Sequence, residues 1–126
     1  MAQHKAPHRE WSPPLRYLGH DKDRKYPEPE TLFDDYANRG AGVRDQDMTI
    51  AKTFTQLDAK LVSPPGINDE QLKQWNAYYE PRNKSFREAK LEGKELVRWR
   101  YNRYMHDYLG CVKAVDDAVG KLLKTL

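Results

Sequence analysis

The chain has 126 residues, a length that fits one domain, and its 22 lysines and arginines against 19 aspartates and glutamates give a formal net charge of +3. This excess is too small to indicate a nucleic-acid partner by itself. Hydrophobic residues make up only 38% of the chain and charged residues 33%, and the apolar residues concentrate in the last third. We therefore expect a piece that packs against something else, or a partly disordered chain.

The lone cysteine, Cys111, excludes an intrachain disulfide, and together with four scattered histidines it gives no zinc-ligand spacing. No stretch approaches the roughly 20 apolar residues of a membrane helix. The first residues lack the apolar core of a signal peptide, and the sequence leaves the localisation open.

Prolines predict an irregular start to the chain. Five of the eight prolines lie in residues 1–30, and a strand end is expected only at 1–4. Because proline fixes its own φ and keeps the preceding residue out of the helical region, the rest of this segment is predicted to be loop.

Two short helices are predicted next. The first covers 31–39, with Thr31 as its N-cap and an end near Gly40. The second covers 43–57 and is followed by a Ser-Pro-Pro-Gly break at 63–66.

A third helix is predicted to begin after Asn68, a good N-cap, with Gln71 three residues later as in a capping box. We expect this helix to end near Tyr79, because Pro81 follows and proline disrupts a helix interior. Residues 80–93 are polar and are predicted to form a loop.

The last segment carries the strongest helical pattern, because apolar residues recur every three or four positions over about eight turns. These residues are Val97, Tyr101, Tyr104, Tyr108, Cys111, Val115, Val119, Leu122 and Leu126. Gly110 and Gly120 predict a bend or a close approach of another segment. Since Cys111 lies on the stripe, we expect its thiol to be buried and structural.

Three polar patterns are explained without a ligand. The adjacent carboxylates at 34–35 and at 116–117 are most simply exposed charges, since a hard cation needs six to eight oxygens from several segments; Asp116 is also a candidate structural hydrogen-bonding residue. The basic and aromatic run at 98–104 could serve single-stranded nucleic acid. On a helix, however, its tyrosines share one face, and docking by that face explains the run. We therefore predict no metal ligands in this chain and no nucleic-acid partner.

Two segments at opposite ends of the chain resemble one family. The first is HKAPHREW at 4–11, and the second is VRWRYNRY at 97–104 with DYL at 107–109 and VDD at 115–117. Together they resemble the type I sulfatases of the alkaline phosphatase superfamily, in particular the subgroup of arylsulfatase A-like and iduronate-sulfatase-like enzymes. The segments at 27–36 and 45–50 also look similar to this subgroup.

The resemblance implies an α/β fold in which helices sandwich a large mixed sheet. This chain would be an internal portion of the catalytic domain. Residues 1–30 would form an active-site loop and extended segment, 31–93 short helices and loops, and 94–126 a long amphipathic helix. In isolation we expect the chain to be mostly helical, with an irregular Pro-rich N-terminal segment, since most of the sheet would lie outside it.

The resemblance also implies a site. In the family, the histidine of the Lys-Ala-Pro-His-Arg segment reaches the sulfate ester, which makes His8 the candidate catalytic residue. An imidazole N–H can bind a sulfate oxygen or protonate the leaving oxygen. Lys5 is the candidate substrate-binding residue, acting as a point charge for the anion, and His4 is a weaker candidate. The substrate of the parent would be a sulfated saccharide or an aryl sulfate.

The rest of the family's machinery is expected to lie outside this chain. The formylglycine nucleophile arises from the first residue of a Cys/Ser-x-Pro-x-Arg motif. Cys111 is followed by Val112, Lys113 and Ala114 and departs from that pattern, and we expect the nucleophile to be absent from this chain. The family's calcium ligands also find no matching segment. The resemblance thus implies a parent that uses Ca²⁺ and formylglycine, and a 126-residue chain that is inactive alone.

An alternative belongs to a different class. A non-catalytic helical interaction module, docking a partner or self-associating through Val97–Leu126, also explains the long apolar stripe. The stripe has little partner surface within the chain itself.

Overall fold

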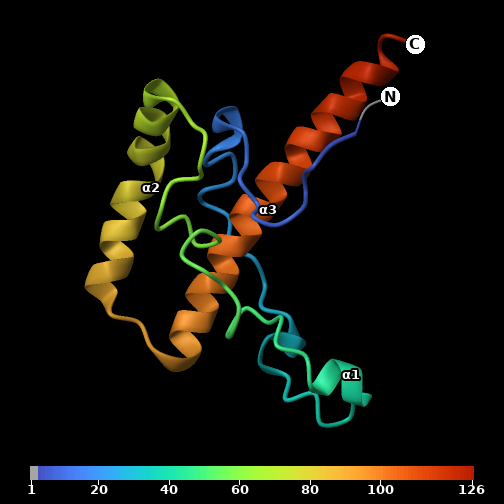
Figure 1. Cartoon of the computed structure of the whole chain (residues 1–126), viewed down its shortest axis with the longest axis vertical. Helices are drawn as coiled ribbons and strands as arrows, with labels where there is room; N and C mark the ends of the chain where they lie inside the picture. Colours follow the sequence, from blue (N-terminus) through green and yellow to red (C-terminus); the bar gives the residue numbers. More distant parts are fainter. Residues whose placement is uncertain (1–2) are drawn as a thin grey trace.

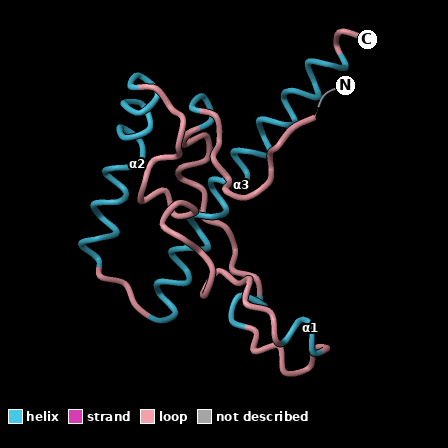
Figure 2. Tube along the Cα trace, in the orientation of Figure 1, coloured by secondary structure: helices cyan, strands magenta, loops and turns pink. Residues whose placement is uncertain are grey.

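The computed structural model describes residues 3–126 as two long helices joined and covered by irregular chain (Figure 1). The helical elements are η1 (Leu15–Tyr17), η2 (Glu30–Phe33), α1 (Ala41–Arg44), α2 (Asp69–Ala89) and α3 (Gly93–Leu123). No strand occurs among the described residues (Figure 2). The prediction of a mostly helical chain with a long C-terminal helix is confirmed. Part of the expected strand end at 1–4 lies outside the described residues, and the remainder is irregular.

The long helices α2 and α3 diverge from a short connection at 90–92, so that they form a V (Figure 1). The short helix η1 contacts both arms. Just after it, Gly19 has φ +70°, and a Cβ there would lie 2.7 Å from Cε2 of Tyr78. Glycine therefore suits both the left-handed backbone and the close approach of this loop to α2.

Helix α2 begins as predicted. The Asn68 side chain accepts from the backbone N–H of Gln71 at 2.9 Å, and the Gln71 side chain accepts from the backbone N–H of Asn68 at 3.0 Å. Two donors that the first turn leaves unpaired are satisfied in this way, and Asp69 and Glu70 complement the helix dipole.

The predicted end of this helix near Tyr79 and the predicted loop at 80–93 are wrong, because α2 continues to Ala89 with Pro81 inside it. An interior proline costs about 3 kcal/mol by removing one helical hydrogen bond and crowding the preceding turn. Tyr79 and Asn83 stand on either side of Pro81, and each is only 1% exposed. Their burial against the rest of the chain favours an uninterrupted helix.

The two short helices are largely wrong predictions. In place of a helix over 31–39 there is a 3-10 turn, η2, which begins after Pro29 rather than at Thr31. It stops because the side chains of Asp34 and Asp35 accept hydrogen bonds from backbone N–H groups two residues on. In place of a helix over 43–57 there is only the single turn α1.

Helix α3 confirms the predicted long helix, but its stripe divides into two parts. Cys111 is buried, while Val119 and Leu122 nearer the end are 44% and 47% exposed. Gly110 provides the expected close approach, since a Cβ there would lie 2.9 Å from Cβ of Pro13. At Gly120 a Cβ would meet no other segment of residues 3–126 within 4 Å. No helix of residues 3–126 has the length and hydropathy needed to cross a bilayer.

The core is small and aromatic. Trp75 and Tyr79 of α2 are 3% and 1% exposed, and their rings lie 4.4 Å apart. Where the arms meet, Phe86 stacks on Trp99 with ring centroids 3.8 Å apart. The irregular chain contributes few buried apolar side chains, of which Phe54 is one.

A cluster of buried polar side chains joins the irregular chain to both arms. Tyr79 donates its hydroxyl to Oδ1 of Asp107 at 2.7 Å, and Lys60 Nζ lies 4.0 Å from Oδ2 of the same carboxylate. Asn83 donates to the backbone oxygen of Lys60 at 2.8 Å and accepts from Arg103 at 3.2 Å. The residues around Lys60 are therefore fixed to α2 and α3 by hydrogen bonds as well as by packing.

Candidate functional site

The candidate site residues Lys5 and His8 lie in one turn. The backbone N–H of His8 donates to the backbone oxygen of Lys5 at 2.9 Å, and both side chains are exposed. The ring nitrogen Nδ1 of His8 lies against the backbone oxygen of Arg9. Because a carbonyl oxygen only accepts, Nδ1 carries the hydrogen of this contact and Nε2 is left for a ligand.

The two side chains line the same hollow, which has a volume of about 380 Å³. Its wall is completed by Ala6, Glu10, Ser12, Pro64, Pro65 and Cys111. Burial raises the pKa of the Cys111 thiol to about 11, so at neutral pH this group is a thiol rather than a nucleophilic thiolate. The expectation of a buried, structural Cys111 is confirmed.

A second hollow, of about 510 Å³, lies on another side of His8. It is more apolar and includes the rings of Trp11, Phe54 and Tyr104. Trp11 meets Tyr104 edge to face with centroids 4.6 Å apart, which attaches the chain just after His8 to α3. His8 thus lies between a polar hollow and an aromatic one.

Arg9 anchors the turn and was missed in the sequence. Its guanidinium forms a two-pronged ion pair with Asp58, with Nε 2.9 Å from Oδ1 and Nη2 on Oδ2, and it also donates to the backbone oxygen of Thr53. The Asp58 side chain is fully buried and accepts further bonds from the backbone and hydroxyl of Thr55, each at 2.8 Å. The only feature of the sequence that could have indicated this anchoring role is that Arg9 directly follows His8. Nothing in the sequence pointed to Asp58.

The environment of Asp58 favours its charged form. Burial by itself raises the pKa of this carboxyl, but the Arg9 guanidinium and the two Thr55 hydrogen bonds outweigh burial and hold the pKa below its usual value. At neutral pH the pair is therefore ionised, and charge-assisted bonds with this two-pronged geometry are stronger than neutral ones.

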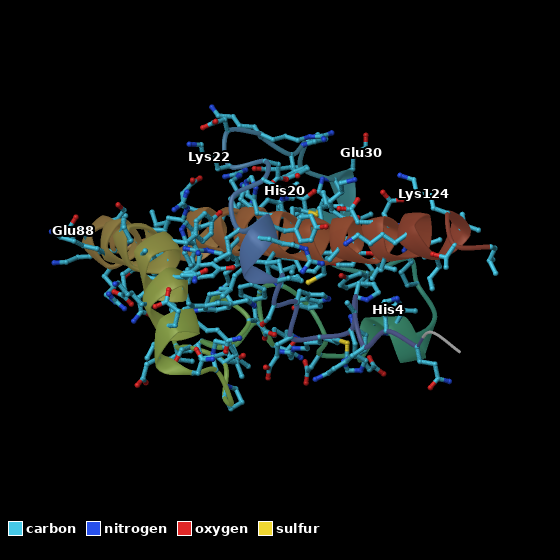
Figure 3. All side chains as sticks on the ribbon, turned by 90° about the horizontal axis from the view of Figure 1, so that it is seen from above. His4, His20, Lys22, Glu30, Glu88 and Lys124 are labelled. Atoms are coloured by element: carbon cyan, nitrogen blue, oxygen red, sulfur yellow. The ribbon has the colours of Figure 1, made fainter. Side chains whose placement is uncertain are left out.

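The other histidines do not join His8. His4 lines a hollow with residues near the end of α3, whereas His20 and His106 both lie against Asp21. Figure 3 shows His4 and His20 on opposite sides of α3. Within residues 3–126 no three His, Cys, Asp or Glu side chains are grouped as metal ligands. The residues present here therefore do not fit the calcium site that the family resemblance implies.

The remaining polar patterns make contacts inside the chain. Asp34 pairs with Arg39, and Asp116 with Lys113. Asp117, the neighbour of Asp116, accepts a hydrogen bond from the hydroxyl of Tyr17, a residue far away in the sequence. The structural hydrogen bond expected of Asp116 is thus made by Asp117.

The arginines of the basic and aromatic run are also occupied within the chain. Arg98 pairs with Glu28 at 2.9 Å, Arg100 donates to the backbone oxygen of Ala51 at 2.6 Å, and Arg103 is buried. The tyrosines share a face as predicted, and Tyr104 and Tyr108 are stacked with centroids 5.4 Å apart.

Comparison with known proteins identifies relatives of this arrangement. No family model matches the chain. The N-acetylglucosamine-6-O-sulfatase of Bacteroides thetaiotaomicron is 39% identical over an alignment of 146 residues that covers 100% of this chain and 25% of that protein. A solved structure, of BT4656 in complex with its substrate D-glucosamine-2-N,6-O-disulfate, matches with a TM-score of 0.86 at 39% identity. This match covers 95% of the present chain and 28% of the other.

The fold and the motif-bearing segments therefore define a helical portion of an alkaline-phosphatase-like hydrolase fold. Over its whole length the chain matches a fragment of a sulfatase, as its sequence resemblance indicated. It spans about a quarter of the length of the relatives it matches.

Proposed function

We propose that this chain supplies one wall of the active site of a sulfatase that removes sulfate from a sulfated saccharide, with a 6-O-sulfated amino sugar as the substrate. The observation that supports this most directly is that Lys5 and His8 line one hollow, within a chain 39% identical to an N-acetylglucosamine-6-O-sulfatase. In the terms of that family, residues 1–126 are an internal portion of the catalytic domain. The hollow lies between its active-site loop, residues 1–30, and Pro64, Pro65 and Cys111.

His8 is the catalytic residue in this proposal. Its Nδ1 is occupied by the backbone oxygen of Arg9, so Nε2 is the ring nitrogen left to contact the ester. When the ring is protonated, Nε2–H donates to a sulfate oxygen or gives its proton to the leaving sugar oxygen as the S–O bond breaks. Lys5 binds the sulfate as a cation, and its contact is common to substrate and transition state.

The nucleophile and the metal belong to the rest of the parent. In the family, a formylglycine hydrate attacks sulfur and Ca²⁺ supports it. In this chain Cys111 does not match the formylglycine motif, Ser12-Pro13-Pro14-Leu15-Arg16 matches only its spacing of Ser, Pro and Arg, and the described residues hold no metal-ligand group. The isolated chain should therefore not hydrolyse sulfate esters. Hydrolysis by the purified chain above the rate of its His8→Ala variant would overturn that expectation.

The proposal is tested in a hybrid enzyme. The matching quarter of the Bacteroides sulfatase is replaced by this chain, and hydrolysis of N-acetylglucosamine 6-sulfate is measured beside a version that lacks the segment. We expect hydrolysis in the hybrid and none without the segment. In the hybrid, Lys5→Ala should raise KM on the order of tenfold, the effect of one charge-assisted contact. A hybrid with a cooperative melting transition but no hydrolysis would count against the proposal.

A second candidate function is self-association through Val97–Leu126. The observation that favours it is the exposed apolar end of α3, where Val119, Leu122 and Leu123 are 44%, 47% and 67% exposed. Light scattering on the purified chain separates the two ideas. A defined dimer that Leu123→Glu dissociates, while Lys113→Glu does not, would support association. A monomer at all concentrations would leave that face to the remainder of the sulfatase.

A further inference from the structure

We propose that Asp58 and Lys60 are positioning residues for His8, because they tie the turn that carries it to the helix pair through Arg9. The inference rests on the proposed role of His8. In this inference, two residues about fifty positions along the chain hold the imidazole in place beside the hollow that Lys5 and His8 line.

The first link of this chain of contacts runs from the turn to Asp58. Residues 3–8 are mostly exposed and gain little from burial. Beside the ring contact of Trp11 with Tyr104, Arg9 fixes the turn at its far end, since its guanidinium meets both oxygens of Asp58 and the backbone oxygen of Thr53. A planar guanidinium on two carboxylate oxygens fixes direction as well as distance. Because the backbone oxygen of Arg9 in turn contacts the His8 ring, this link sets the orientation of the imidazole.

The second link runs from Asp58 to Lys60. The Lys60 ammonium donates to the backbone oxygens of Asp58 at 3.1 Å and Leu57 at 3.3 Å, which closes the turn that presents the Asp58 carboxylate. The Lys60 side chain has no exposed surface, and its backbone takes a positive φ of 57°. A buried cation in a strained backbone position persists only where its surroundings hold it.

The third link joins Lys60 to both arms of the V. The backbone oxygen of Lys60 accepts from Asn83 of α2, and its ammonium lies 4.0 Å from Asp107 of α3. No hydrogen-bond donor reaches Oδ2 of Asp107, so the ammonium is the nearest compensating charge for that oxygen. From the helix core to the turn, the Asp107 carboxylate is compensated by the Lys60 ammonium, the ammonium holds the backbone of the Asp58 turn, and the Asp58 carboxylate pairs with Arg9. Removing Lys60 leaves the buried Asp107 carboxylate without this compensating charge, and removing Asp58 leaves Arg9 without its carboxylate.

The experiment is NMR on the full 126-residue chain. Backbone order parameters for residues 5–10 and the ring Cε1–H signal of His8 are compared between the unsubstituted chain and Asp58→Asn. We expect the order parameter at His8 to fall from about 0.85 to below about 0.6, with the ring signal moving to its free-histidine position. Signals of Trp75 and Tyr79 should remain, because the helix pair keeps its own packing. Lys60→Met should lower the order parameter at His8 by a smaller amount.

The matched control is Asp47→Asn. Asp47 lies in the same irregular segment and pairs with Lys52 at 2.8 Å, but it is 75% exposed and has no connection to Arg9. It should leave the His8 signals unchanged. If Asp58→Asn does not fold, Arg9→Gln tests the same link from the exposed end and should give the same loss.

An unchanged order parameter and ring signal at His8 in folded Asp58→Asn or Arg9→Gln would overturn the proposal. The same result in folded Lys60→Met would remove Lys60 from it. These readouts do not depend on catalysis. If Asp58→Asn loosens His8 but the His8→Ala hybrid hydrolyses the substrate at full rate, the positioning is upheld and the proposed function is rejected. If His8 stays ordered in Asp58→Asn but His8→Ala abolishes hydrolysis in the hybrid, the proposed function is upheld and the positioning is rejected.

Discussion

The helix pair α2–α3 and the irregular residues 3–67 are held by different forces. The helices satisfy their own backbone groups and pack aromatic rings, with Trp75 and Tyr79 almost fully buried. The irregular chain is attached to them by single side chains, such as the Tyr101 hydroxyl on the backbone oxygen of Pro27 at 2.8 Å. The helix pair is thus a scaffold stabilised by buried aromatic surface, whereas the segment that carries His8 is held in place by a few directional contacts.

Truncating the aromatic core should have the largest effect and should break both regions together. Trp75→Ala removes a side chain that is 3% exposed, and we expect a loss of roughly 3–5 kcal/mol in the free energy of unfolding. Urea unfolding followed by circular dichroism measures it. Phe33→Ala, at a ring that is 38% exposed, serves as the control and should cost less than about 1 kcal/mol. Equal losses in the two variants would mean that the aromatic core is not the scaffold.

The buried charges where the two regions meet should give the next largest effect. Burial lowers the pKa of Lys60 and raises that of Asp107, so each group depends on the other to stay charged. Lys60→Met and Asp107→Asn alone should each cost about 3 kcal/mol, because each leaves one charge uncompensated. The double variant should cost clearly less than the sum. Strict additivity in this double-mutant cycle would show that the two groups do not interact.

Acid should loosen the irregular region before the scaffold. The pKa of Asp58 is depressed in the fold, so its stabilisation is present above the unfolded value of about 3.9 and is lost as the pH falls through the lower folded value. Between pH 6 and pH 3 the unsubstituted chain should lose more unfolding free energy than Asp58→Asn, with most of the difference appearing below about pH 4. Parallel pH profiles of unfolding free energy for the two chains would be the opposite result.

The smallest effect belongs to a local feature of the scaffold. Asn68→Ala removes the capping box of α2 and should cost about 1 kcal/mol. Asn76→Ala, at an exposed position within the same helix, should cost nothing or stabilise slightly. If both substitutions had the same effect, the cap would contribute nothing to α2.

The sequence predicted the scaffold better than the irregular region. The start of α2 and the whole of α3 follow from local signals, namely a capping box and a three-to-four spacing of apolar residues. The passage of α2 through Pro81 does not, because it depends on the burial of Tyr79 and Asn83 by segments distant in the sequence. The helix expected over 43–57 had too little buried surface to support it: Phe54 is buried, but Val43 and Met48 are 48% and 78% exposed.

The site was predictable only in part. His8 and Lys5 were found through a family motif, and the structure brings them to one hollow. The partner of Arg9 was not predictable, since Asp58 lies 49 residues away and no local pattern joins the two. The segment around Lys60 shows neither a helical nor a strand periodicity, so no sequence pattern predicted that this side chain is buried.

The central claim is that His8 acts on the sulfate ester, and its most direct test is kcat/KM of the hybrid sulfatase with N-acetylglucosamine 6-sulfate. His8→Ala is compared with His20→Ala, whose imidazole lies against Asp21 and lines neither hollow at His8. The account predicts a fall of about 10²–10⁴ for His8→Ala, the usual loss when a general acid is removed, and no change for His20→Ala. A folded His8→Ala hybrid that hydrolyses the substrate as fast as the unsubstituted one would contradict it.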